Sequence, residues 1–180
     1  MHIFSELKKI ILSSLQANGL IIKLVILDQI TKWWLINYFL RHPGGTIKTN
    51  FILNIVPAWN HGISFGYLGD FHQYSSMILA FINFMVVIYL WNIFAKSKSL
   101  VSSIGYSSII GGALGNIIDR LTRGAVFDFI HFHYDELSFP IFNLADIFIS
   151  IGSFLLIYNY YQNKKAIEQE EDTEYDASGK

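Results

Sequence analysis

GGALGNIIDRLTRGAVFDFIHFHYDELSFPIFNLAD, residues 111–146, decides how the rest of the chain can fold. The stretch begins inside one long apolar segment and ends inside the next. It carries six polar groups, which are Asn116, Asp119, Arg120, Asp128, Asn143 and Asp146. Ionisable groups in or beside a membrane-spanning segment are costly, so they are candidates for function. A single aspartate near a helix end more often pairs and snorkels toward water, but six such groups in one window favour a functional site.

The composition indicates an integral membrane protein of one domain. Hydrophobic residues make up 52% of the 180 residues and charged residues only 15%, whereas soluble domains carry about 25% charged residues. The mean hydropathy is +0.38. The formal net charge of −1 gives no basis for nucleic-acid binding. Because the chain has no cysteine, disulfides, thiol nucleophiles and thiolate metal sites are excluded.

Four apolar segments, each about the length that crosses a bilayer, predict a membrane all-α bundle of four transmembrane helices. They are residues 20–40, 74–95, 100–121 and 141–161. The third segment is rich in glycine and serine, which permits close helix packing. In the first segment, Asp28 and Lys32 are four residues apart and can pair on one helix face.

Two longer polar loops, residues 41–72 and 122–140, separate these segments. Residues 46–56 are rich in β-branched side chains and predict a strand, and the closely spaced glycines after Pro57 predict irregular backbone. Residues 1–19 are either a short interfacial helix or a poorly ordered terminus. Residues 162–180 form a charged tail, expected to be disordered beyond its first turns and cytoplasmic.

The distribution of lysine and arginine predicts the orientation in the membrane. The N-terminal flank, the turn at residues 95–99 and the start of the tail each carry two lysines, whereas the two longer loops carry three basic residues spread over more positions. The positive-inside rule therefore places both termini in the cytoplasm and both loops outside. The polar groups of residues 111–146 can then converge near the outer membrane surface, beside Asn60 of the first loop.

Carboxyl groups that meet in a partly dry site suit one kind of chemistry. Two of them cannot both ionise cheaply, so the pair shares a proton. The ionised member can take a proton from water while the protonated member donates to a substrate carbonyl, which is an arrangement for amide hydrolysis. The structural alternative is that Asp128 only pairs with Arg120 or Arg123. His131 and His133, with Asp128 and Asp135 nearby, are a weak candidate metal site, and we expect neither a metal nor another cofactor.

Five sequence blocks carry a resemblance to a known family. They are Asp28-Gln-x-Thr-Lys32, Asn60-x-Gly-x-Ser-Phe-Gly66, Gly111-Gly-Ala-Leu-Gly-Asn116-x-x-Asp-Arg120, Gly124-x-Val-x-Asp-Phe129 and Phe142-Asn-x-Ala-Asp146. Each block alone is weakly specific, but five in this order resemble lipoprotein signal peptidase, the type II signal peptidase of bacteria, over roughly residues 20–160. One departure is Ser64, where the family more often has alanine.

The resemblance implies an intramembrane aspartyl endopeptidase with four transmembrane helices and a small extracytoplasmic β-rich cradle. It implies that the enzyme removes signal peptides from diacylglyceryl-modified prolipoproteins, cutting before the lipidated cysteine, in the bacterial inner membrane near its outer face. It also implies inhibition by globomycin. We expect a monomer whose partners are lipid-modified substrates and membrane lipid.

The resemblance also assigns roles to individual residues. The catalytic pair is Asp128 and Asp146. The residues that position substrate and support the pair are Asn60, Gly62, Asn116, Arg120 and Asn143. The structural residues are Asp28, Lys32 and Asp119.

Two rival functions remain open from the sequence. A small proton-coupled transporter would also use intramembrane carboxylates, but such proteins usually show internal repeats and broken helices at mid-depth, and the sequence shows neither. An assembly factor whose polar residues only hold helices together would not explain several aspartates and asparagines at one level.

Overall fold

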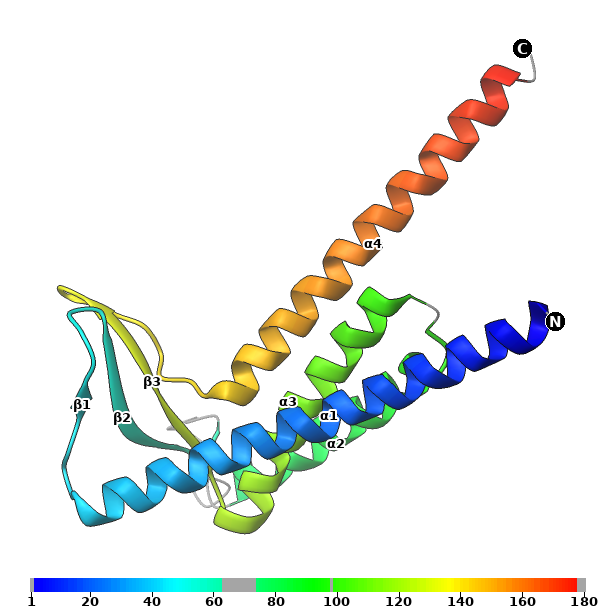
Figure 1. Ribbon diagram of the computed structural model, residues 1–180. Coiled ribbons are helices and arrows are strands. Elements are labelled where there is room, and N and C mark those ends of the chain that lie inside the picture. Colours follow the sequence, from blue (N-terminus) through cyan, green and yellow to red (C-terminus); the bar gives the residue numbers. More distant parts are fainter. Residues whose placement is uncertain (1, 63–73, 98, 178–180) are drawn as a thin grey trace.

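The computed structural model describes residues 2–62, 74–97 and 99–177, which form four helices and one four-stranded sheet. The elements in chain order are α1 (His2–Arg41), β1 (Ile47–Lys48), β2 (Leu53–Asn60), α2 (Ser75–Phe94), α3 (Leu100–Arg123), β3 (Val126–Tyr134), β4 (Leu137–Ser138) and α4 (Leu144–Ala177). The sheet lies at one end of the helices and both chain ends lie at the other (Figure 1).

Two helices extend further than the sequence predicted. Residues 2–19 and the first predicted span belong to one helix, α1, without a break at Gly19. At the other end of the chain, α4 continues through the charged residues to Ala177, where disorder was expected beyond the first turns. Strong helix formers such as glutamate, lysine and glutamine dominate this stretch, so helix propensity accounts for the continuation.

Within the described residues, three helices are long and apolar enough to cross a membrane: Ser75–Phe94, Leu100–Arg123 and Leu144–Glu170. These are the second, third and fourth predicted spans, so the structure confirms a membrane protein built on helices. The helix α1 differs because its apolar half also carries Lys23, Asp28 and Lys32.

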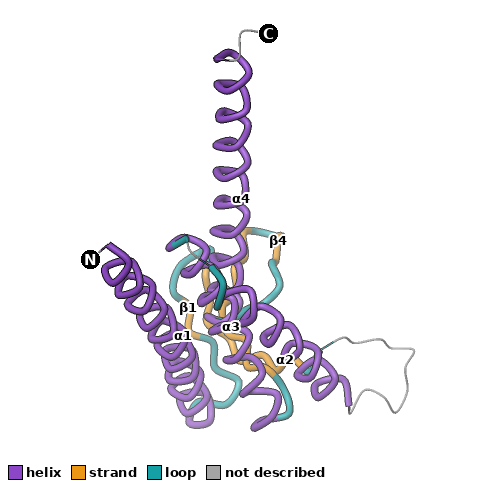
Figure 2. The backbone as a smooth tube through the Cα atoms, turned by 90° about the vertical axis from the view of Figure 1, so that its right-hand side faces the viewer, coloured by secondary structure: helices purple, strands orange, loops and turns teal. Residues whose placement is uncertain are grey.

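The helix α3 is central and packs against the other three helices (Figure 2). Its glycines make this close approach possible, as the sequence predicted. A β-carbon on Gly112 would lie 2.3 Å from the carbonyl oxygen of Ala145 on α4, and one on Gly111 would lie 3.1 Å from Leu24 Cβ on α1. Near the other end of the interface, a β-carbon on Gly152 of α4 would lie 2.5 Å from the carbonyl oxygen of Gly105. Glycine therefore sets the spacing between α3 and its neighbours.

The sheet is antiparallel in the order β1-β2-β3-β4. The strand β2 extends to Asn60, although irregular backbone was predicted after Pro57. The strands β3 and β4 lie in the second polar loop, for which the residue pattern predicted no strand, and together with β1 and β2 they form the small sheet that the family resemblance implied. The register of β2 against β3 shifts between Ile55 and Ala58. This irregularity surrounds Pro57, which has no amide hydrogen for the ladder, so the strand accommodates proline with a bulge and then resumes pairing.

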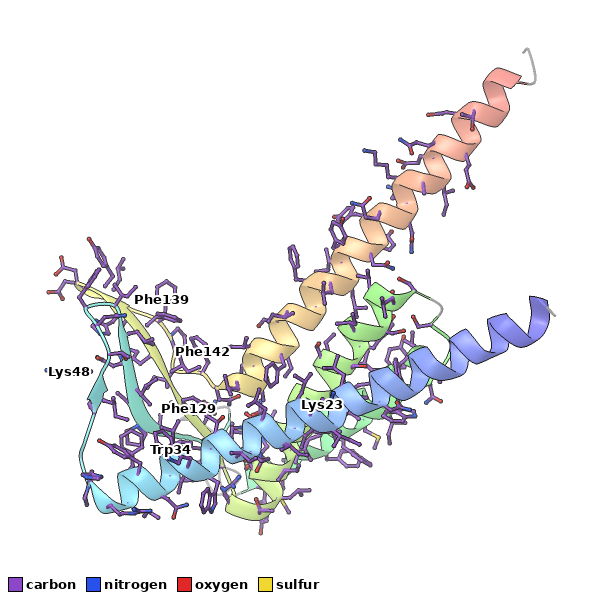
Figure 3. All side chains as sticks on the ribbon, in the orientation of Figure 1. Lys23, Trp34, Lys48, Phe129, Phe139 and Phe142 are labelled. Atoms are coloured by element: carbon purple, nitrogen blue, oxygen red, sulfur yellow. The ribbon has the colours of Figure 1, made fainter. Side chains whose placement is uncertain are left out.

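An apolar cluster fixes the sheet to the end of α1. Its buried members are Leu35 and Phe39 from α1 and Phe127 and Phe129 from β3. Along β3, every residue from Val126 to Phe129 is buried, which is why the usual alternation of polar and apolar side chains is missing there. Asp128 is therefore held between two buried phenylalanines. Figure 3 shows Phe142 on the segment that leads from the sheet to α4.

Candidate active site

The first turn of α4 places Asp146 by a reciprocal cap. The backbone amide of Asp146 donates to Oδ1 of Asn143 at 3.1 Å, and the backbone amide of Asn143 donates to Oδ2 of Asp146 at 3.1 Å. This is the capping-box arrangement, with Asn143 as the N-cap and Asp146 at the third helical position. The three-residue spacing of these side chains in the sequence therefore fixes the Asp146 carboxylate over the start of its own helix.

The same Asn143 also reaches the second aspartate. Its side-chain amide donates to Oδ1 of Asp128 on β3. From the neighbouring strand, the side-chain amide of Asn60 donates to Oδ2 of Asp128 at 3.0 Å. One asparagine thus contacts both carboxylates, and both oxygens of Asp128 accept an amide hydrogen bond.

The end of β2 is shaped to present Asn60. Oδ1 of Asn60 accepts a hydrogen bond from the backbone amide of Gly62 at 2.9 Å. Gly62 has a φ of 105°, a conformation that favours glycine. This turn directs the amide nitrogen of Asn60 toward Asp128. The rest of the predicted Asn60–Gly66 block, including Ser64, lies outside the described residues.

Asn116 on α3 joins the two aspartates from a third direction. Its side-chain amide donates to Oδ1 of Asp146 at 2.9 Å, and its Oδ1 accepts from the side chain of Asn143 at 3.2 Å. Asn116, Asn143 and Asp128 are all buried, with 6%, 0% and 3% of their surface exposed. The three predicted asparagines therefore bond to the two carboxylates, of which Asp128 is buried and Asp146 half-buried.

Arg120 lies one turn further along α3 and is buried. Its NH1 donates to the backbone oxygen of Asn116 at 3.4 Å, and its Nε has no hydrogen-bond partner among the described residues. Its charge interacts with Asp146 and Asp128 across the site. The described residues contain no ion pair between Asp128 and an arginine, and Arg123 pairs with Asp119 instead. The pairing of Asp128 with Arg120 or Arg123 that was considered from the sequence is therefore not seen among the described residues.

Behind the site, a buried polar network joins α1 to α3. The Lys32 ammonium contacts Oδ2 of Asp28 at 2.9 Å and Oδ2 of Asp119 at 2.8 Å. All three side chains are fully buried. Because α1 and α3 each supply an aspartate to one lysine, the network joins these two helices.

The network also reaches α4 and β3. Oδ1 of Asp28 accepts from the backbone amide of Ala145 at 3.1 Å, and Oδ2 of Asp119 accepts from the backbone amide of Phe127 at 3.2 Å. The first of these bonds satisfies an amide of the first helical turn that has no partner within the helix. Ala145 and Phe127 directly precede Asp146 and Asp128, so the network anchors the backbone beside each aspartate.

Two further members of the network were not predicted as site residues. The Gln29 amide donates to Oδ1 of Asp119 at 3.0 Å and to the backbone oxygen of Gly115 at 3.1 Å, and its Oε1 accepts from Arg123 at 3.1 Å. Two local features of the sequence could have indicated that they belong to the network: Gln29 is adjacent to Asp28, and Arg123 lies four residues after Asp119 on the same helix face.

Burial raises the pKa of Asp128 above its ordinary value. The hydrogen bonds from Asn60 and Asn143 oppose this rise, and the charge of Asp146 adds to it. Burial has the largest effect, so Asp128 holds a proton more readily than an exposed aspartate does. This is the property expected of a carboxyl group that shares a proton with a neighbour.

The histidines of β3 contact each other and β4 within the described part of the chain. Nε2 of His131 lies 2.8 Å from Oγ of Ser138 on β4, and the His131 and His133 rings are 5.5 Å apart. The described part of the chain has no group of three potential histidine, cysteine or carboxylate ligands.

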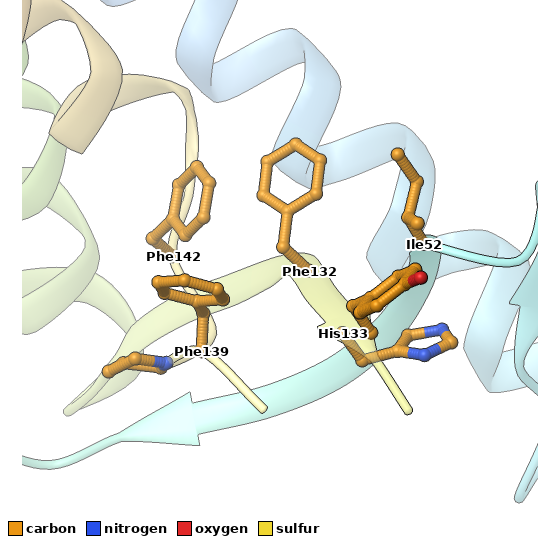
Figure 4. Close-up of a pocket in the computed structure, with 7 residues that line it drawn as sticks. Ile52, Phe132, His133, Phe139 and Phe142 are labelled. Atoms are coloured by element: carbon orange, nitrogen blue, oxygen red, sulfur yellow. The ribbon is translucent and has the colours of Figure 1, made fainter. Parts of the chain in front are cut away.

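An apolar cavity of about 530 Å³ opens beside the same strand (Figure 4). Its lining includes Phe132, Phe139 and Phe142, together with Ile52 and His133. Phe142 directly precedes Asn143, and its backbone pairs with Ile130. The cavity can accommodate apolar groups but supplies no carboxylate.

Comparison with known proteins places the geometry in context. Residues 20–162 match the family model described as signal peptidase II. The chain is 49% identical to the lipoprotein signal peptidase of Rickettsia bellii over 169 residues, which is 94% of this chain and 86% of that protein. It is also 49% identical to the lipoprotein signal peptidase of Rickettsia felis over 173 residues, which is 96% of this chain and 88% of that protein. Among solved structures, a bacterial membrane enzyme determined by the in meso method at 1.9 Å resolution matches with a TM-score of 0.67 and 30% identity, covering 81% of this chain and 92% of that one.

Proposed function

We propose a mechanism for this chain, which belongs to the signal peptidase II family and removes signal peptides from prolipoproteins. In this mechanism, Asp128 and Asp146 act together as a pair of carboxyl groups that activate a water molecule. The observation that carries the proposal is that one residue, Asn143, donates hydrogen bonds to both carboxylates, through its side chain to Asp128 and through its backbone to Asp146.

The reaction follows from a pair that holds one proton. The ionised carboxylate takes a proton from a water molecule while the water oxygen bonds to the carbonyl carbon of the scissile peptide. The protonated carboxyl donates its proton to the carbonyl oxygen, which gives a neutral tetrahedral diol. As the diol collapses, one of its hydroxyls gives its proton to the ionised carboxylate, the carbon–nitrogen bond breaks, and the protonated carboxyl gives its proton to the leaving amine, so the pair again holds one proton. Neither step needs a metal or a covalent intermediate.

The supporting residues stabilise this pair in different ways. Asn60, Asn116 and Asn143 donate amide hydrogens to carboxylate oxygens, so they hold the two groups in fixed orientations. The Nε–H of the buried Arg120 guanidinium has no hydrogen-bond partner among the described residues. It is available to donate to the substrate backbone or to the oxygen that gains charge in the transition state.

The substrate class that best suits this site is a prolipoprotein carrying a diacylglyceryl group, cut before the lipidated cysteine. The two acyl chains of such a substrate insert into the bilayer, and each buried CH₂ group contributes about 0.8 kcal/mol. This anchoring holds the substrate near the depth proposed for the site. The partners are therefore the lipid-modified substrate and the surrounding membrane lipid. The proposed form is a monomer.

The proposed topology has four spans, with α1 as the first. The charges of Asp28 and Lys32 are paired and fully buried against α3, so α1 does not expose them to lipid. Both chain ends lie at one end of the helices and the sheet lies at the other (Figure 1). Together with the lysine distribution, this supports cytoplasmic termini in the bacterial inner membrane and a site near the outer face.

The test is a comparison of three purified variants. Asp128→Asn and Asp146→Asn should each lower the rate of cleavage of a diacylglyceryl lipopeptide by at least about 10²–10⁴-fold, the usual contribution of general acid–base catalysis. Asp135→Asn is the matched control, because Asp135 is an exposed acid at the hairpin after β3. Retained cleavage by either of the first two variants, with both still folded in detergent, would rule out the two-carboxylate mechanism.

A further inference from the structure

All three hydrogens of the Lys32 ammonium have an acceptor within the protein. Its ammonium has three acceptors: Oδ2 of Asp28, Oδ2 of Asp119, and Oδ1 of Asn116 at 3.0 Å. A lysine ammonium has three hydrogens and no acceptor, so these contacts use every donor it has. The side chain is fully buried, which excludes water as an alternative partner.

This arrangement fixes which way the Asn116 amide points. The oxygen and nitrogen of an asparagine side chain can normally exchange places when both find partners. Here a donor-only ammonium faces one of the two atoms, so that atom must be the oxygen. The amide nitrogen of Asn116 is then directed at Oδ1 of Asp146, 2.9 Å away.

We propose that Lys32 is a positioning residue for the reaction, acting through Asn116 to keep an amide donor on Asp146. The proposal rests on the proposed role of Asp146 in hydrolysis. Without the ammonium, the Asn116 oxygen keeps only the Asn143 amide as a donor, so the side chain is held less firmly and can turn its oxygen toward the Asp146 carboxylate. Two acceptors facing each other repel, so Asp146 would lose both its donor and its fixed orientation.

Arg120 and Asp128 interact electrostatically with Asp146, and Asp28 and Asp119 pair with Lys32. The variants that are compared must therefore carry the same charges at these four positions. Replacing Lys32 alone would leave Asp28 and Asp119 with too little positive charge in a buried region, and the protein could fail to fold for that reason. The comparison therefore uses charge-balanced double variants.

The two double variants are Asp28→Asn with Lys32→Met and Asp28→Asn with Lys32→Gln. Both remove one negative and one positive charge, and the amide introduced by Asp28→Asn keeps an oxygen for the backbone of Ala145. They differ in one property: glutamine has an amide donor to offer the Asn116 oxygen, whereas methionine has none. Asp28→Asn alone is the reference. Thr31→Val is the control for the effect of any substitution on this helix. Thr31 is half-buried on α1, and its hydroxyl donates to the backbone oxygen of Leu27 in the same helix and not to the network.

The measurements are kcat, KM and the pH dependence of kcat on a diacylglyceryl lipopeptide, with thermal unfolding as a check on folding. The methionine variant should lose about 10-fold or more in kcat with KM little changed, because a small misplacement of a reacting group is costly in rate. The pH dependence of its kcat should also differ from that of the glutamine variant, because the carboxyl pair has lost an amide donor. The glutamine variant should recover most of both changes.

Equal kcat values and equal pH profiles in the two double variants would overturn the proposal. If the methionine variant does not fold, Asn116→Leu is used instead, because it removes the amide donor to Asp146 without adding a charge to the site. That variant should show the same loss of kcat and the same changed pH profile, and wild-type values for both would reject the role of Lys32. Failure of the two-carboxylate mechanism can be distinguished from failure of the Lys32 proposal, because only the former would let the Asp146→Asn variant cleave the substrate.

Discussion

Gly112→Ala tests how closely the position of α4 is tied to activity. A β-carbon at this position would lie 2.3 Å from the Ala145 carbonyl oxygen and 2.8 Å from Ile149 Cγ1. Ordinary contact begins at 3.4 Å, so α4 must move by about 1.1 Å to accommodate one methyl group. Because the nearest atom is backbone, a side-chain rotation cannot relieve the clash. The displaced turn is the one that carries Asn143 and Asp146.

The expected effect on activity is larger than the effect on stability. Overpacking costs about 1–3 kcal/mol, and replacing glycine by alanine inside a helix returns about 1 kcal/mol, so the net loss in the free energy of unfolding is about 0–2 kcal/mol. A misplacement of about 1 Å at reacting groups can lower the rate about 10²-fold. The assay is kcat on a diacylglyceryl lipopeptide beside thermal unfolding in the same detergent.

Gly152→Ala is the matched control on the same helix interface. Its β-carbon would lie 2.5 Å from the Gly105 carbonyl oxygen, so the clash is nearly as severe. Position 152 is six residues, or about 9 Å, along α4 from Asp146. We expect a similar change in melting temperature with a much smaller loss of kcat. If Gly112→Ala keeps kcat within about threefold of the wild type, or if both variants lose activity equally, the link between helix position and the site is wrong.

Three further predictions follow from the site. The pKa of Asp128 is higher in the folded than in the unfolded protein, so this group stabilises the fold at pH values below its unfolded pKa. That stabilisation is lost as the pH rises through the folded pKa. Asp128→Asn should therefore flatten this decline when the melting temperature is measured against pH. Asn60→Ala removes a bond that lowers the same pKa, so the acid limb of the kcat profile should move to higher pH, whereas Asn54→Ala on the same strand should leave it in place. A reporter fused to the C-terminus should be active only on the cytoplasmic side, and an external signal would reverse the proposed topology.

The spans and the close helix packing were predictable because they depend on short-range properties of the sequence. Apolar length is read directly from residues 74–95 and 141–161, and the glycines of residues 111–115 mark a surface where a neighbour can approach. The spacing of Asn143 and Asp146 likewise predicted a shared helix face, and the structure shows them as the two members of one cap. The strand β3 was harder to predict from the sequence, because its buried first half lacks the alternation of polar and apolar residues.

The sequence by itself determined that the chain is a membrane protein with polar groups gathered near one end of its helices, because hydropathy and helical spacing are local properties. Only the tertiary structure decided which atoms meet. Asp28 accepts from Ala145 across 117 positions of the chain, and Lys32 reaches Asn116 across 84. These contacts depend on how three helices pack around glycine, and the orientation of an amide or the donor to a carboxylate is settled by partners that are distant in sequence and close in space.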